Sequence, residues 1–166
     1  AWKRTSKGFV NNYGQVIQGA TMKGIDVSQW NGNINWAKVA KSDVDYAIIR
    51  VGYGDNYTYQ DDTYFKKNVQ GCIDNKIPFG VYIYSYEVNT SMAKSEANHV
   101  LRLINGLKLD FPVYFDMEDN SQLNGTNRAT RGAIAKTFCN TITAKGYKVG
   151  IYANLNWWNN YLTDKA

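Results

Sequence analysis

The chain has 166 residues, of which 44% are apolar and 20% are charged, with a formal net charge of +5. This length is enough for one domain with a substantial core, and the composition excludes a disordered chain. The positive charges are scattered, so no nucleic-acid-binding surface is indicated, and no apolar run approaches the roughly 20 residues of a membrane-spanning helix. Aromatic residues reach 14%, which suits either a surface that stacks on sugars or bases or an aromatic-rich core.

Residues 1–22 differ in pattern from the rest of the chain, and we expect them to form a linker or appendage. Within them, the segment 8–19 combines glycines, asparagines and aromatic residues around a polar centre, which predicts a short hairpin. The chain opens without a signal peptide. We therefore expect that it begins after processing or is an excised part of a longer protein, with the main domain spanning residues 23–166.

From residue 23 onward, strand and helix patterns alternate. Strands are predicted at 24–28, 46–52, 79–86, at the start of 111–120, and at 148–154. Helices are predicted at 34–42, 62–75, 91–105 with a Thr90/Ser91 cap, 127–145, and from about 157. Because a helix follows each strand, the sheet is predicted to be parallel. Two topologies fit this pattern, an open doubly wound sheet and a β/α barrel.

The alternation of residues within the strands favours the barrel. One parity is apolar in all five strands, as expected for a face that packs on helices. An open sheet covered on both faces would be apolar on the other parity as well. Here the other parity is polar and aromatic: Asp26, Ser28, Arg50, Gly52, Tyr82, Tyr84, Tyr86, Tyr114, Asp116, Glu118, Tyr152 and Asn154. We therefore predict an α/β fold of the TIM-like barrel type, with about five β–α units and a site at the carboxyl ends of the strands.

Three carboxylates are predicted to meet at that end. Asp116 and Glu118 lie two residues apart on one strand, so they share a face with Cα atoms roughly 6.5–7 Å apart, and Asp26 comes from the first strand. A structural salt bridge, with Arg50 as the available partner, is the alternative interpretation. Paired carboxylates in different protonation states are what acid–base cleavage of a glycosidic bond requires.

The motifs around these acids resemble those of the glycoside hydrolase family 25 lysozymes. The similarity is carried by 24–32 (GIDVSQWNG), 46–54 (YAIIRVGYG), 80–82 (GVY), 114–118 (YFDME) and 151–154 (IYAN). These motifs fall in the family's order over about residues 23–162. The resemblance implies an N-acetylmuramidase that cuts the β-1,4 bond between N-acetylmuramic acid and N-acetylglucosamine in bacterial peptidoglycan.

The resemblance also implies roles for single residues. Glu118 would be the general acid, kept protonated by the neighbouring Asp116 anion. Asp116 would orient or polarise the N-acetyl group of the substrate or stabilise positive charge on the sugar, and Asp26 would assist electrostatically or position water. The predicted substrate-binding residues are Tyr82, Tyr152, Arg50, Tyr84 and Trp30, although Trp30 suits core packing equally well. Among the possible routes, we favour one assisted by the substrate's own N-acetyl group.

The same reading predicts no cofactor, no metal site, no nucleic acid or membrane as partner, and no obligate protein partner. Location would be extracellular or in the cell wall. Family barrels continue beyond the fifth strand to a further site aspartate, and Asp164 comes too early to be that residue. We therefore expect that the C-terminal strands are missing, and that these 166 residues alone are marginally folded or weakly active.

Five further residues are given structural interpretations. His99 is expected at the surface of its helix, and Asp61-Asp62 at the start of the second helix. Cys72 and Cys139 are expected to be buried thiols within helices. Two alternative functions stay open: a glycan-binding module that uses the same fold without turnover, and a glycosidase for another N-acetylated polymer such as chitin.

Overall fold

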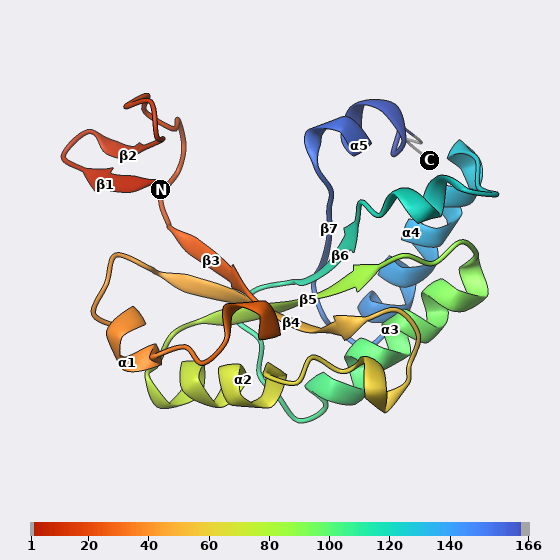
Figure 1. Cartoon of the computed structure of the whole chain (residues 1–166), viewed down its shortest axis with the longest axis horizontal. Helices are drawn as coiled ribbons and strands as arrows, with labels where there is room; N and C mark the ends of the chain where they lie inside the picture. The colour runs from red at the N-terminus through yellow and green to blue at the C-terminus, as the bar shows by residue number, and fades with distance from the viewer. Residues whose placement is uncertain (1, 164–166) are drawn as a thin grey trace.

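Five parallel strands form the centre of the computed structural model, which describes residues 2–163 (Figure 1). The strands are β3 (Gly24–Val27), β4 (Tyr46–Tyr53), β5 (Phe79–Ser85), β6 (Val113–Met117) and β7 (Val149–Tyr152). They lie in the order β3-β4-β5-β6-β7. A doubly wound sheet reverses its strand order at a switch point, whereas this order follows the chain. The α/β fold and the parallel sheet are confirmed, and within residues 2–163 no ladder joins β3 to β7.

Helices follow the strands as the sequence predicted. They are α1 (Trp36–Val39), α2 (Phe65–Asp74), α3 (Thr90–Ile104), α4 (Arg128–Thr143) and α5 (Leu155–Asn160), with short 3-10 helices η1 (Gln29–Asn31), η2 (Thr58–Gln60) and η3 (Asn120–Leu123). Asparagine side chains cap four of the α-helices by accepting a backbone N–H of the first turn. The cap of α3 is Asn89, so the predicted Thr90/Ser91 cap is wrong by one residue.

The core lies between one face of the sheet and helices α2, α3 and α4. Ile49, Val81 and Phe115 on that face are fully buried, and Phe115 stacks on Phe138 of α4 with ring centroids 4.1 Å apart. These strand residues are the apolar parity of the sequence. Because the helices cover this face, the polar and aromatic residues of the other parity are left for the opposite face, where the site forms.

A β-bulge in β4 changes which residues face the site. The register pairs Arg50 with Tyr82, but then shifts so that Gly52 pairs with Ile83 and Tyr53 with Tyr84. The extra residue reverses the alternation. A Cβ at Gly52 would lie 2.8 Å from the ring of a histidine of α3, so Gly52 faces the helices. Its predicted place on the polar face is wrong.

His99 is buried rather than at the surface, with 0% of its area exposed. Its ring nitrogens contact the Gly54 carbonyl at 3.1 Å and the Asp61 carboxylate at 2.8 Å. The prediction failed because these partners come from the loop after β4, far away in sequence. Asp61 and Asp62 also do not start α2, whose N-cap is Tyr64.

Cys72 is buried in α2 and Cys139 is partly buried in α4, and both thiols are free. The prediction of thiols in helices is confirmed. Asp164 lies outside the described residues. No helix among residues 2–163 is long and apolar enough to cross a membrane.

A two-stranded hairpin precedes the sheet and projects away from it (Figure 1). It pairs β1 (Lys3–Thr5) with β2 (Gly8–Val10). The chain then turns back, with a bridge between Val10 and Val16, so the hairpin predicted within 8–19 is present. An exposed ion pair of 2.5 Å joins Arg4 to Asp45 beside the sheet.

Candidate active site

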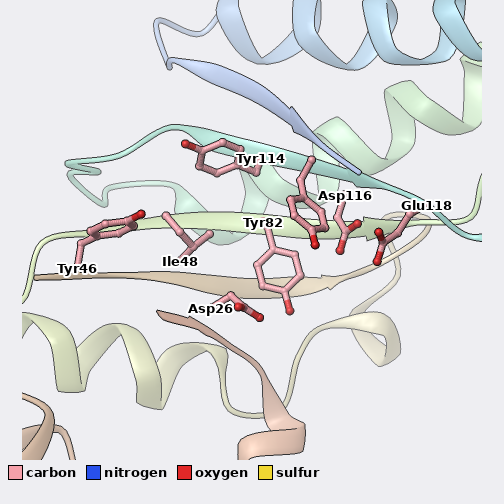
Figure 2. Close-up of a pocket in the computed structure, with 8 residues that line it drawn as sticks. Asp26, Tyr46, Ile48, Tyr82, Tyr114, Asp116 and Glu118 are labelled. Carbon is pink, nitrogen blue, oxygen red and sulfur yellow. The ribbon is translucent and has the colours of Figure 1, made fainter. Parts of the chain in front are cut away.

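A cavity of about 300 Å³ opens on the face of the sheet that the helices leave free (Figure 2). Its walls contain three carboxylates, four tyrosines and one isoleucine: Asp26, Tyr46, Ile48, Tyr82, Tyr114, Asp116, Glu118 and Tyr152. The structure therefore brings together all three predicted acids and two of the predicted substrate-binding tyrosines. Figure 2 shows the Asp116 and Glu118 side chains beside one another, with Asp26 on the far side of Tyr82.

The register of the sheet explains this convergence. Arg50, Tyr82 and Tyr114 are aligned on β4, β5 and β6, and the next row aligns Tyr84 with Asp116. Residues aligned across parallel strands project to the same side, so each row forms one layer of the site. Tyr152 is aligned with Asp116 from β7.

Tyr46 and Ile48 were missed by the sequence analysis. A signal was present, because they precede Arg50 at two-residue spacing on the same strand. The polar residues that identified the site lie near the carboxyl ends of the strands, so this pair at the start of β4 was not selected. Both lie farther from the carboxyl ends than the acids do, and they extend the cavity toward the start of β4.

The pKa of the Asp116 carboxyl departs strongly from its ordinary value. It is only 8% exposed, and its Oδ1 has no hydrogen-bond partner among the described residues. Burial raises its pKa to about 7, with further contributions from the charges of Glu118 and Asp26, while Arg50 acts in the opposite direction. The sequence analysis expected Glu118 to hold the proton and Asp116 to be ionised. In the structure, Asp116 is neutral below about pH 7.

Glu118 lies just past the end of β6 and is half-buried. Its Oε2 accepts a hydrogen bond of 2.9 Å from the backbone N–H of Asn154. The next residue, Asp119, caps η3 by accepting the Ser121 N–H at 2.8 Å. Asp119 also accepts a 2.8 Å hydrogen bond from the Tyr84 hydroxyl. These contacts hold the Glu118 side chain and the residue that follows it.

The two tyrosines of β5 have different environments. Burial raises the pKa of Tyr82 to about 12, so this wall residue keeps its hydroxyl proton over the physiological range. Burial and the bond to Asp119 also raise the pKa of Tyr84. Tyr84 does not line the cavity, because its hydroxyl is directed to Asp119.

Arg50 lies beneath the site rather than among the residues that line it. Its Nε donates to the buried Asp62 carboxylate at 2.8 Å, while Nη2 has no hydrogen-bond partner among residues 2–163. The salt-bridge alternative thus holds for Arg50, but its partner is Asp62. The guanidinium still acts on the site, because its charge favours ionised Asp116.

Trp30 is 80% exposed on η1, so packing in the core is excluded. It does not line the cavity. Asp62 also accepts the Gln29 N–H at 2.9 Å, which ties η1 to the partner of Arg50. Within the described part of the chain, no group of three or more histidine, cysteine or acidic side chains is arranged to hold a metal ion.

The comparison of residues 25–166 gives a match to the family model "Glycosyl hydrolases family 25". Lysozyme M1 of Streptomyces globisporus is 29% identical over 147 residues, which cover 83% of this chain and 48% of that protein. The autolytic lysozyme of Clostridium acetobutylicum is 28% identical over 141 residues, covering 85% of this chain and 41% of that protein. The chain thus spans less than half the length of these curated relatives.

Among solved structures, the modular autolysin LytC of Streptococcus pneumoniae matches with a TM-score of 0.84 and 28% identity, over 98% of this chain and 40% of that one. A second LytC structure, in complex with a synthetic peptidoglycan ligand, matches with a TM-score of 0.83 and 27% identity, with the same coverage of both chains. The bacterial lysozyme of Streptomyces coelicolor matches with a TM-score of 0.75 and 25% identity, over 87% of this chain and 68% of that one.

Proposed function

Because the chain belongs to family 25 of the glycosyl hydrolases, we propose that it hydrolyses bacterial peptidoglycan at the β-1,4 bond between N-acetylmuramic acid and N-acetylglucosamine. The observation that carries the proposal is the meeting of Asp26, Asp116 and Glu118 in one tyrosine-lined cavity. The similarity to LytC, which has been solved with a synthetic peptidoglycan ligand, supports the choice of substrate. The site of action would be the cell wall or the extracellular space.

In the proposed reaction, Glu118 is the general acid. Because Asp116 is neutral below about pH 7, this role does not depend on an Asp116 anion that keeps Glu118 protonated. Glu118 is half-buried at the mouth of the strands, so it reaches both substrate and solvent. Its proton passes to the glycosidic oxygen as the bond from that oxygen to the anomeric carbon breaks. After the leaving sugar departs, the Glu118 carboxylate takes a proton from the water that completes hydrolysis.

Asp116 orients the N-acetyl group of the substrate. The carbonyl oxygen of this N-acetyl group then attacks the anomeric carbon as the leaving oxygen departs. No enzyme nucleophile is needed for this route. Asp116 is buried and has an unpartnered Oδ1 among the described residues, which leaves an oxygen available for the amide. Asp26 acts from β3, where its charge stabilises the positive anomeric centre.

The first experiment is a turbidity assay on bacterial cell walls with the Glu118→Gln variant. We expect lysis to fall at least about 100-fold, because an amide cannot donate the proton. Asp74→Asn, on the exposed end of α2, is the matched control and should lyse normally. Wall binding without any lysis by the full-length protein would instead support a glycan-binding module.

Two product measurements refine the substrate and the route. Purified peptidoglycan should be cleaved and chitin should not, and the reverse result would contradict the proposed substrate. The new reducing end should retain its anomeric configuration, as expected when the N-acetyl group attacks first and water second. Inversion would rule out the substrate-assisted route while leaving the hydrolase proposal intact.

A further inference from the structure

The Asn154 backbone N–H donates to Glu118 Oε2 across 2.9 Å, which joins β7 to the acid of the site. The register pairs Asp116 with Tyr152, so two residues farther along Glu118 is opposite Asn154. The β6–β7 ladder has ended by then. The Glu118 carboxylate therefore occupies the place in which a backbone carbonyl would continue the ladder.

Asn154 is itself held in place by a second interaction. Its side-chain Oδ1 accepts the backbone N–H of Trp157 at 3.0 Å and so caps α5. Trp157 is 1% exposed and belongs to the hydrophobic core. The amide that points to Glu118 is thus attached to a fixed part of the fold, and side chain and backbone of Asn154 perform separable tasks.

Several charged or titratable groups surround Glu118. Its negative charge contributes to the raised pKa values of Asp116 on β6, Tyr84 on β5 and Tyr152 on β7. An ionised Asp116 disfavours a second negative charge on Glu118, whereas an N–H donor favours it. The Asn154 amide therefore opposes the effect of Asp116.

We propose that Asn154 is a positioning residue, whose backbone N–H fixes the Glu118 carboxyl and favours its ionised form, so that it helps to set the pH at which the enzyme loses its acid. This inference rests on the proposed function of Glu118 as the general acid. It assigns the effect to the amide and not to the asparagine side chain, which distinguishes it from a purely structural role in capping α5.

The variant Asn154→Pro tests the amide directly. The backbone of Asn154 has φ −70°, which proline adopts, and proline has no N–H to donate. Asn154→Ala is the matched control, because it loses the same side-chain cap but keeps the N–H. In the full-length protein, we expect the alkaline limb of the pH–rate profile to lie about 0.5–1 pH unit higher in the proline variant than in the alanine variant. Equal limbs would overturn the inference.

A second measurement needs neither lysis nor the proline variant. In the wild-type protein, the NMR signal of the Asn154 amide should shift with pH at the same midpoint as the Glu118 carboxyl carbon, and in Glu118→Gln this shift should disappear. An amide signal that does not follow Glu118 would overturn the inference even if the protein lyses walls. A coupled titration in a protein that does not lyse walls would overturn the proposed function alone.

Discussion

The buried Asp116 carboxyl is expected to make the stability of the protein depend on pH. Its folded-state pKa of about 7 lies above the ordinary aspartate value of 3.8. Between these pH values, the folded state keeps a proton that the unfolded state has lost, so the free energy of unfolding falls as pH rises. This loss of stability from ionising Asp116 is absent below about pH 4 and reaches its full size above about pH 7.

Asp116→Asn removes this ionisation. We expect it to raise the free energy of unfolding at pH 8 by about 2–4 kcal/mol and to change it little at pH 4, as measured by urea denaturation. The control is Asp45→Asn. The pKa of Asp45 is shifted in the opposite direction to that of Asp116, because the Lys23 backbone N–H and, to a smaller extent, Arg4 lower it. Relative to the wild type, this control should lower the free energy of unfolding at pH 8, and this loss should shrink as pH falls below about 4. A pH-independent effect of Asp116→Asn would contradict the prediction.

At the scale of elements, the contact of α1 with α2 depends on one glycine. A Cβ at Gly71 would overlap the indole of Trp36, a buried residue of α1. Alanine usually stabilises a helix interior by roughly 1 kcal/mol relative to glycine. Here we expect Gly71→Ala to destabilise the protein by about 1–3 kcal/mol, measured by thermal or urea unfolding. As a control, Ala in place of the exposed neighbour Gln70 should leave the free energy of unfolding nearly unchanged. A Gly71→Ala variant that is more stable than the wild type would contradict the prediction, because α1 could then shift away from α2 without loss of stability.

At the scale of the whole molecule, the net charge of +5 should affect how the protein meets its substrate. Scattered positive charge attracts an anionic polymer over a distance that salt shortens. We expect the initial rate of wall lysis to fall several-fold between about 20 mM and about 300 mM NaCl. Cleavage of a short soluble fragment of the same glycan should change much less. Equal salt effects on both substrates would contradict the prediction, because salt would then act on the cleavage reaction and not on the attraction of the protein to the wall.

The strands, and the face of each strand that carries the polar and aromatic residues, could be predicted because both follow from local sequence patterns. Asp26, Asp116 and Tyr152 were placed on one face by two-residue periodicity alone, and the sheet confirms that all three line one cavity. Membership of the family was predicted from motifs of a few residues on all five strands, and the family match agrees.

What escaped prediction depends on partners distant in sequence. The bulge that reverses Gly52 is decided by pairing with β5, and the burial of His99 depends on Asp61. His99 was expected at the surface because its neighbours in the helix are polar, but one of them, Glu96, is buried as well and accepts a 2.8 Å hydrogen bond from the Ser85 hydroxyl. No periodicity in the sequence distinguishes a buried polar group with a partner from an exposed one.

The strand order β3-β4-β5-β6-β7 has a consequence for how the protein is made. Each new strand pairs with the one that left the ribosome just before it, so the sheet can grow by addition at one edge during synthesis. Asp26 is then in place long before Asp116 and Glu118 arrive. The mutual repulsion of the three acids therefore arises only once β6 has been made, after β3, β4, β5 and the helices α2 and α3.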